Sequence, residues 1–462
     1  MIILSYRGDI MEKIKNEIES ILKKARERNE FSSSRLLDTC YLTDYAPSGS
    51  IWTEALQKAI SEHEVVYIPK KDTPYLIDNS IIVPSNRKII AEKDAVIKLL
   101  IECRVLLMRN EDTCDGTYAP ITKKRSENIT IDGGIWEESC PHRMGYGLSG
   151  KYDEDRTFFG VSTCMLFENI NNLTLRNMTF RNCGAFALQI GECTDAIIEN
   201  IIFESCYADG VHVNGNVENI HVKNIKGEVG DDLVAFNMFD WQNSSINFGP
   251  AKNVICEDLV LSESSHYKAL RIEPGVYTFK DGKKVDCSLE NAIFRRINGI
   301  KTFKLYCQTP PHSPSLPPEP ADVGSGDNIF FEDIKIDLTE PIDKLDGYVT
   351  NDEIKGSFAG FELGLNAKSI YLKNIDITLY REKFPFSYLL CIGPKSARGE
   401  NGIEFFDPYF SSSVDNLYLE SIKVNGEKPR DISPYIREIT FDSLYEELES
   451  TASGKIWNII YR

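Results

Sequence analysis

One short phrase recurs along the chain and constrains its fold more than any other feature. Each copy begins with Asn, Asp or Ser, continues with an alternating apolar stretch and a polar pair, and ends with a second apolar stretch. Apolar alternation of this kind predicts β-strands rather than helices. The copies are NITIDGGIW at 128, NLTLRNMTF at 172, DAIIENIIF at 195, NIHVKNIKG at 219, NVICEDLVL at 253, NAIFRRING at 291, NIFFEDIKI at 328, SIYLKNIDI at 369 and NLYLESIKV at 416.

The distances between these copies predict how the strands are arranged. Successive copies start 44, 23, 24, 34, 38, 37, 41 and 47 residues apart. The shortest distances fit one coil of a β-solenoid, and the longer ones fit the same coil with an inserted loop. A β-sandwich would need regularly spaced hairpin turns, and an α/β fold would need long helical stretches between strands. The sequence contains neither pattern, so it predicts a single all-β solenoid.

The two ends of the chain differ from the repeats. Residues 11–28 have the pattern of a charged amphipathic helix, and residues 51–61 predict a helical cap before the first strand. Caps are expected because the open end of a solenoid exposes strand edges. The predicted organisation is N-terminal helices and a cap at 1–62, one β-helix domain at 63–433, and an irregular C-terminal tail or cap at 434–462 with a helix near 441–449.

The charge and the apolar content of the sequence argue against nucleic acid and membrane as partners. The 52 Lys and Arg residues against 70 Asp and Glu residues give a net charge of −18, which argues against nucleic acid. No apolar run approaches the ~18 residues of a membrane span. The apolar stretch at residues 1–4 is too short for a signal peptide, so a cytoplasmic protein acting on imported oligosaccharides is expected. The oligomeric state is open between a monomer and a homo-oligomer.

Twelve cysteines are present, without a CxxC pair that would favour zinc. Cys183 and Cys206 each lie 11 residues after the start of a repeat, at Asn172 and Asp195. Equal offsets in neighbouring coils predict stacked side chains, because adjacent strands lie about 4.8 Å apart. These thiols are therefore expected to be reduced and to fill the core as neighbours. No metal or obligatory cofactor is expected.

Chemically active residues gather at one position of the repeats. Offsets 12 to 14 hold Asp209, Asp231 with Asp232, His266 and Lys304 in four successive copies. The solenoid predicts that they form one vertical line. Stacked carboxylates raise one another's pKa, which lets a hydrolase keep one carboxyl protonated as a general acid and another ionised as a base. A calcium site and a plain solvated polar face are the alternatives.

The segment CYADGVHVNGNVENIHVKNIKGEVGDDLVAFN at 206–237 resembles the core of glycoside hydrolase family 28, the polygalacturonase family, within the pectin-lyase-like superfamily. That family carries Asn-Thr-Asp-Gly, then Gly-Asp-Asp one coil later, then Gly-His-Gly and Arg-Ile-Lys. Here Asp209-Gly210 matches the end of the first motif, and Gly230-Asp231-Asp232 matches the second. The resemblance covers roughly residues 50–310. It implies a right-handed parallel β-helix and hydrolysis with inversion.

The resemblance also implies a role for each matched residue. Asp231 would protonate the leaving oxygen, and Asp209 with Asp232 would activate water on the opposite face of the sugar. Inverting enzymes typically hold the acid and the base ~6.5–9.5 Å apart. His266 would tune the protonation of the acid. In the family, the Arg and Lys of the last motif hold a carboxylate of the substrate, and Lys304 matches that Lys.

The sequence departs from the family pattern at three places. Tyr207-Ala208 replaces Asn-Thr, Ser265 and Tyr267 replace the two glycines, and Thr302 replaces the Arg of the last motif. Arg271, which belongs to a different coil of the predicted stack, is a candidate to replace that Arg. Half of the carboxylate clamp is thus altered in a strongly acidic chain. Cleavage of a glycosidic bond is therefore better supported than polygalacturonate as the substrate.

Strand continuations beside these residues supply candidate sugar contacts, since aromatic faces and planar polar groups suit sugar C–H faces and hydroxyls. Asn237, Arg271 and Tyr306 are the strongest candidates. The others are Gln189, Glu192, His212, Asn214, Trp241 and Glu273.

The sequence thus predicts a polygalacturonase-like glycoside hydrolase acting on a pectin-type or other plant or microbial glycan. Loop insertions in the later coils favour exo action. The alternatives are a polysaccharide lyase acting on a uronic-acid glycan, for which Lys304 or Arg271 would serve as the base, and a non-catalytic glycan-binding β-helix.

Overall fold

Each repeat forms strands that pair in parallel with the next repeat along the chain. The residue after the first position of each copy pairs with its counterpart one coil away, and this register holds throughout the set. The aligned residues are Ile129, Leu173, Ala196, Ile220, Val254, Ala292, Ile329, Ile370 and Leu417. The register confirms the predicted repeat spacings, including those that contain inserted loops.

The structure is a computed structural model. It describes residues 2–33, 38–101, 103, 105–113, 124–140, 163–240, 245–265, 269–278, 281–299, 302–306, 323–338, 358–382, 385, 387–393, 395–398, 404–406, 411–439 and 453–462. Its helices and 3-10 turns are α1 (Ile2–Ser33), η1 (Leu42–Asp44), α2 (Thr53–Glu62) and η3 (Ser433–Tyr435). The strands of the first half are β1 (Thr39–Tyr41), β2 (Val65–Ile68), β3 (Tyr75–Ile77), β4 (Ile81–Val83), β5 (Arg87–Leu99), β6 (Met108–Asn110), β7 (Ser126–Glu137), β8 (Thr163–Arg176), β9 (Thr179–Arg181), β10 (Phe186–Cys206), β11 (Val211–Asn214), β12 (Val217–Val229), β13 (Val234–Asn237) and β14 (Ala251–Leu261). The strands of the second half are β15 (Leu270–Ile272), β16 (Gly275–Thr278), β17 (Lys284–Cys287), β18 (Leu289–Asn298), β19 (Phe303–Tyr306), β20 (Ser325–Leu338), β21 (Phe358–Gly364), β22 (Asn366–Leu379), β23 (Ser387–Ile392), β24 (Lys395–Arg398), β25 (Glu404–Phe406), β26 (Ser412–Glu420), β27 (Lys423–Val424), β28 (Ile436–Glu438) and β29 (Gly454–Tyr461).

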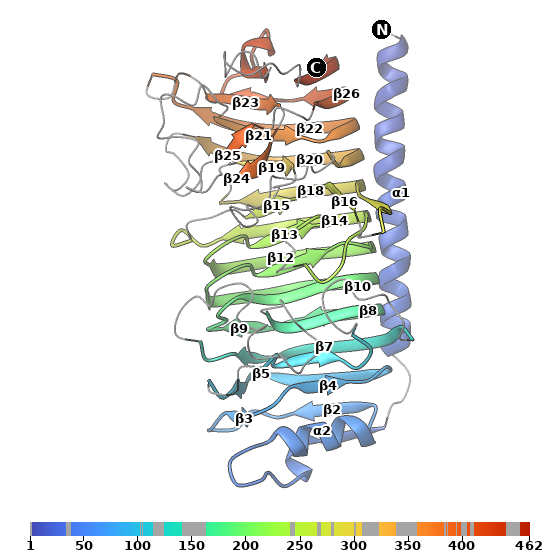
Figure 1. The fold of residues 1–462 in the computed structure, drawn as a ribbon, viewed down its shortest axis with the longest axis vertical. Helices are drawn as coiled ribbons and strands as arrows, with labels where there is room; N and C mark the ends of the chain where they lie inside the picture. The colour runs from blue at the N-terminus through green and yellow to red at the C-terminus, as the bar shows by residue number, and fades with distance from the viewer. Residues whose placement is uncertain are drawn as a thin grey trace.

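The strands stack into columns that run the length of the molecule (Figure 1). One column contains β11, β13, β15, β19, β21 and β23, joined by the first part of β10. A second column contains β12, β14, β18, β20, β22, β26 and β29. Long strands such as β10 pass from one column to the next. The predicted all-β architecture of stacked coils is therefore found.

An asparagine ladder explains why the copies begin with the same residue type. Asn219, Asn253, Asn291 and Asn328 adopt positive φ values between 52° and 59°, a conformation that Asn tolerates better than most residues. Each side-chain amide donates to the residue one coil earlier, beginning with Asn219 Nδ2 to Asp195 Oδ1 at 2.8 Å and Asn253 Nδ2 to Asn219 Oδ1 at 2.9 Å. The ladder marks one corner of successive coils and fixes their register.

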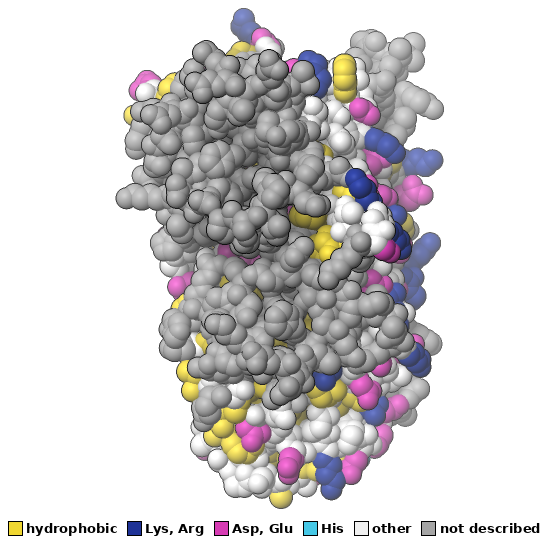
Figure 2. All heavy atoms as spheres, in the orientation of Figure 1, with side chains coloured by type: hydrophobic (Ala, Val, Ile, Leu, Met, Phe, Trp, Pro, Cys, Tyr) yellow, Lys and Arg dark blue, Asp and Glu magenta, His cyan; other side chains and the backbone are white. Residues whose placement is uncertain are grey.

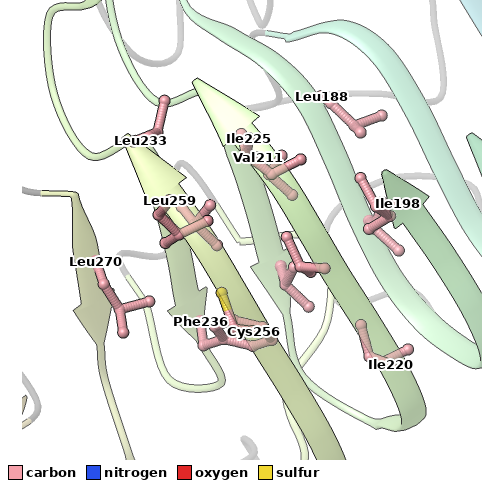
Figure 3. Packing of buried hydrophobic residues seen from close by; sticks show 14 of the residues in the cluster. Leu188, Ile198, Val211, Ile220, Ile225, Leu233, Phe236, Cys256, Leu259 and Leu270 are labelled. Carbon is pink, nitrogen blue, oxygen red and sulfur yellow. The ribbon is translucent and has the colours of Figure 1, made fainter. Parts of the chain in front are cut away.

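The inward side chains form apolar columns that fill the stack. Leu188, Val211 and Leu270 belong to one such column, and Ile198 and Cys256 to another (Figure 3). These residues are fully buried. Because each coil covers the apolar face of its neighbour, the core is continuous along the stack.

The predicted sulfur neighbours lie in this interior. Cys183 lies between Cys164 and Cys206, with side-chain hydrogen bonds to both. Burial is the main cause that raises the pKa of Cys183 well above its ordinary value. Every cysteine that the structure describes is a free thiol. The stacking of Cys183 and Cys206 is thus confirmed.

Helix α1 lies along the side of the stack, with its N-terminus beside the last coils (Figure 1). It contacts β8, β10, β12, β14 and β18. Ile18 and Leu22 are buried against a column of outward apolar side chains that includes Ile255, Ile293 and Phe330. The predicted amphipathic helix is confirmed, and it covers a face of the solenoid rather than its end. The described helices include none that is both long and apolar enough to cross a membrane.

Ion pairs join α1 to the same coils, and charged side chains of both signs line this edge of the molecule (Figure 2). The pairs are Lys15–Glu332 at 2.6 Å, Glu19–Arg295 at 2.8 Å, Arg26–Glu199 at 2.7 Å and Arg28–Asp195 at 2.7 Å. They reach from β10 to β20, so the helix is fastened to coils far apart along the stack.

Replacing Leu22 by alanine is expected to destabilise the protein by about 2–5 kcal/mol, because it removes a buried side chain between α1 and the stack. The measurement is urea unfolding followed by circular dichroism. Lys23→Ala is the matched control, since the side chain of Lys23 is 77% exposed. Equal midpoints for the two variants would contradict a role of α1 in stability.

The structure confirms one prediction for the ends of the chain and corrects two others. Helix α2 confirms the predicted cap, but β1 precedes it and pairs with β2, so the solenoid begins before residue 63. Where the structure describes it, the C-terminal tail contains regular strands, because β28 pairs with β23, and β29 pairs with β26 at seven positions. In β29, Asn458 pairs with Asn416 and donates to its Oδ1 at 3.4 Å, so it begins a further copy of the repeat that the sequence analysis did not include. The helix predicted near 441–449 lies outside the described residues.

Candidate active site

Three carboxylates meet at a corner that precedes β11 and β13. Asp209 lies before β11, and Asp231 and Asp232 lie one coil later, before β13. One oxygen of each residue lies within 4.8 Å of one oxygen of each of the others. Asp232 is fully buried, and Asp209 and Asp231 are 3% and 9% exposed. The sequence predicted this group, called the Asp trio below, and the structure brings it together.

Glycines next to the Asp trio let the two coils approach closely. A Cβ on Gly230 would lie 2.4 Å from the Tyr207 carbonyl oxygen, and one on Gly210 would lie 2.6 Å from that of Leu233. No side chain fits at such distances. Across this contact, the Asp232 N–H donates to Asp209 Oδ1 at 3.2 Å. The glycines of the two matched motifs therefore serve to hold the carboxylates in adjacent coils.

His212 lies between two buried carboxylates. Its Nδ1 is 2.6 Å from Asp209 Oδ2, and its Nε2 is 2.8 Å from Asp240 Oδ2. Burial alone would lower the pKa of His212, but the hydrogen bonds to the two carboxylates outweigh it and raise the pKa to about 10. The ring is thus an imidazolium at neutral pH. It stacks on Phe186 with the ring centres 3.9 Å apart.

Burial and the hydrogen bond to His212 also shift the pKa of Asp209. Burial is the main cause that raises the pKa of Asp209, and the hydrogen bond with His212 opposes it. The negative charge of Asp231 raises it further. Asp209 is therefore a stronger proton acceptor than an exposed aspartate, with a cation beside it that favours its ionised form.

Arg271 is paired with carboxylates of the protein. Its guanidinium donates to Glu273, and its Nη1 lies 3.6 Å from Asp232 Oδ2. Burial lowers the pKa of Arg271, but the charges of Glu273 and Asp232 raise it well above the ordinary value. Burial raises the pKa of Glu273 to about 7, although Arg271 opposes the shift.

The outer face of the first column carries most of the predicted sugar contacts. In register, Gln189 lies beside His212, Asn214 beside Asn237, and Arg271 beside Lys304. Tyr306 lies beside Glu273 in the same register, and the Lys304 Nζ is 5.9 Å from the centre of its ring. Gln189 Nε2 donates to Asn214 Oδ1 at 2.7 Å. All of these residues except Arg271 are buried.

Three predictions of placement or contact require correction. Lys304 does not lie in line with the Asp trio, because its register position falls three residues beyond that of Asp232, next to Arg271. Corner segments differ in length between coils, so equal offsets in the sequence do not give equal positions there. His212 uses both ring nitrogens on carboxylates, so its predicted hydrogen bond to sugar is replaced by a role inside the site. Glu192 likewise accepts from Arg125, Asn216 and Asn247 rather than facing the Asp trio.

Two predicted site residues, His266 and Trp241, lie outside the described residues. Two buried residues were missed. Asp240 holds His212, and Glu362 lies in register beside Lys304. Asp240 follows a strand rather than a repeat start, so repeat offsets gave no signal for it. Glu362 lies 58 residues after Lys304, beyond a long insertion, and only the strand pairing reveals its position.

Among the residues that the structure describes, two groups of side chains have the composition of a metal site. The Asp trio offers three oxygen ligands of the kind that calcium prefers. Glu138, Cys164 and Cys183 form the second group, with one ligand atom of each within 4.8 Å of the others. Glu138 also accepts the Gly184 N–H at 2.8 Å, so it has a structural role at the corner without any metal.

Comparison with solved structures identifies the fold. Over 95% of its length, the chain is similar to 96% of the hyperthermoactive exopolygalacturonase from Thermotoga maritima, with a TM-score of 0.50 and 14% identity. It also matches the family 28 exopolygalacturonase of Yersinia enterocolitica, over 88% of this chain and 79% of that one, with a TM-score of 0.48 and 12% identity. The polygalacturonase from Erwinia carotovora ssp. carotovora matches over 85% of this chain and 97% of its own, with a TM-score of 0.41 and 12% identity. No protein-family model matches the sequence. The resemblance to polygalacturonases is thereby confirmed for the fold.

Proposed function

We propose that the chain is a glycoside hydrolase that cleaves glycosidic bonds with the Asp trio, on a right-handed parallel β-helix. The observation that carries this proposal is the gathering of three buried carboxylates from adjacent coils. Such a cluster is unfavourable for stability, because the charges repel one another and are removed from water. Perturbed carboxylates of this kind are more typical of catalytic sites than of scaffolds. The fold shared with the Thermotoga exopolygalacturonase supports the same activity.

Each member of the Asp trio has a role in this proposal. Asp231 is the most accessible of the three and protonates the leaving glycosidic oxygen. Asp209 and Asp232 activate the attacking water. The raised pKa of Asp209 suits a general base, since a base works best when its pKa lies near the operating pH. His212 does not touch the sugar and acts as a positioning residue that holds Asp209.

In glycoside hydrolases, the configuration of the product depends on the distance between the two reacting carboxyl groups. The motif resemblance implies inversion, which usually needs a separation of ~6.5–9.5 Å to admit a water molecule. One oxygen of each member of the Asp trio lies within 4.8 Å of one oxygen of each other member, which is closer than the separation typical of inverting enzymes. Inversion therefore rests on the resemblance, and the configuration of the first product distinguishes the two mechanisms.

The test is proton NMR of an oligosaccharide panel during turnover, with Asp231→Asn as the control. We expect a new anomeric signal that the control does not produce. A first product of opposite configuration would support inversion, and one of the same configuration would support retention. Mid-chain cleavage of long polymers would contradict exo action, which the loop insertions in the later coils favour.

A lyase is the second candidate, because three carboxylates within 4.8 Å could hold calcium beside a uronic acid. A lyase forms a double bond that absorbs ultraviolet light, and hydrolysis does not. Products that absorb in the ultraviolet, formed only when calcium is present, would replace the hydrolase proposal by this one.

A further inference from the structure

The described groups around the Asp trio carry more negative than positive charge. The cations are His212 and Arg271. The carboxyl groups beside them are Asp209, Asp231, Asp232, Asp240 and Glu273, so the acidic groups outnumber the two cations even when Asp231 is protonated as the general acid. All of these residues except Arg271 are at most 9% exposed, so solvent screens their charges poorly. A ligand that adds a further negative charge is therefore disfavoured at this site.

The cation best placed to offset such a charge is occupied by the protein. The Arg271 guanidinium contacts Glu273 and faces Asp232, and the Glu273 side chain is 1% exposed. A substrate carboxylate at Arg271 would compete with Glu273 and Asp232 for the same guanidinium and would bring a third carboxylate next to theirs. Weakening a buried ion pair in this way is unfavourable, because it leaves a charge in the interior without its partner. Arg271 thus organises the site and is not presented to an acidic sugar.

Two neighbouring side chains present hydrogen-bond acceptors instead. Asn237 Oδ1 and Glu273 Oε2 are buried and have no hydrogen-bond partner within the part of the chain that the structure describes. The register places these residues side by side on β13 and directly after β15. A sugar hydroxyl or ammonium group can donate to both oxygens, whereas an ionised carboxylate offers only acceptors.

We propose that the sugar bound beside the Asp trio is neutral or carries an amino group, that it is not a uronic acid, and that Glu273 sets this specificity. This inference rests on the proposed hydrolase function. It assigns to Glu273 the rejection of acidic sugars, through its own charge and through its hold on Arg271.

The first experiment uses matched pairs of oligosaccharides, each consisting of a uronic-acid oligomer and its carboxyl-reduced, neutral counterpart with the same linkage. We expect kcat/KM for the neutral member of the cleaved pair to exceed that for the acidic member by at least about 100-fold, since like-charge contacts cost several kcal/mol. Equal or faster cleavage of the acidic member would overturn the specificity proposal while leaving the hydrolase function intact.

A binding measurement separates failure of the specificity from failure of the hydrolase function. If no pair is cleaved, the hydrolase proposal fails, and the same pairs are compared by the shift in melting temperature that they cause. A rise in melting temperature with the neutral oligosaccharides alone would support the proposed specificity, as a property of a binding site rather than of an enzyme. No shift with any member, or a shift with acidic members, would overturn it.

Glu273→Gln tests the residue itself. It removes one negative charge and frees the charge of Arg271, so the ratio of acidic to neutral cleavage, or binding, is expected to rise at least about tenfold. Glu218→Gln is the matched control, because Glu218 is exposed on β12 away from the site, and it should leave the ratio unchanged. An unchanged ratio in Glu273→Gln would show that Glu273 does not set the specificity.

Discussion

Asparagine in place of Asp231 is expected to lower kcat on the cleaved glycan by about 10²–10⁴-fold, the usual contribution of a general acid. Asparagine keeps the size of the side chain but cannot give a proton to the leaving oxygen. The Asp trio loses one negative charge, so the variant should unfold at the same temperature as the natural protein or at a higher one.

Initial rates and thermal unfolding of Asp231→Asn would be measured together, with Asp415→Asn as the control. Asp415 is exposed on β26, and its replacement should change neither quantity. Asp232→Asn should also lose activity, because it shares the base role. Full activity in Asp231→Asn would move the acid role to another residue.

The largest expected effect on stability comes from His212. Replacing it by alanine leaves Asp209 and Asp240 buried without the cation between them, which is expected to destabilise the protein by about 3–5 kcal/mol at pH 7. His63→Ala is the control, since His63 pairs with Asp38 at the surface, where such pairs contribute at most about 1 kcal/mol.

The difference between the natural protein and His212→Ala should depend on pH in a defined direction. The pKa of His212 is raised from 6.5 to about 10 in the folded chain, so the folded state binds this proton more tightly than the unfolded state. The stabilisation is complete below about pH 6.5 and is lost as the pH rises towards 10. Unfolding measured from pH 6.5 to 10 should show the two proteins converging. A constant difference over that range would contradict the buried imidazolium.

The stacking of the coils could be predicted because it depends on a local requirement that repeats. Each coil needs a residue that tolerates positive φ at the same corner, and Asn219 and Asn253 mark that corner in the sequence. Asp209, Asp231 and Asp232 could be predicted for a related reason. Gly210 and Gly230 lie next to these carboxylates and let two adjacent coils approach closely, which is again a local requirement visible in the sequence.

Other features could not be predicted because they depend on segments that do not repeat. The offset that placed Lys304 in line with the Asp trio failed where corner lengths differ. Asp240 follows β13 without any periodic signal, yet it holds His212 in the site. The pairing of Arg271 with Glu273 could not be predicted either, because it depends on side-chain direction within one strand and its continuation.

Helix α1 changes how a molecule of this shape can come apart. In a solenoid, each coil contacts only its neighbours, so coils can in principle melt one at a time from either end. Helix α1 contacts strands from β10 to β20 and so joins coils, such as those of β10 and β20, that are not neighbours in the stack. Its binding surface is completed late during synthesis, because its partners on β18 and β20 are synthesised more than 250 residues after the helix. The contacts of α1 with coils far apart in the stack therefore favour unfolding of these coils together rather than one at a time.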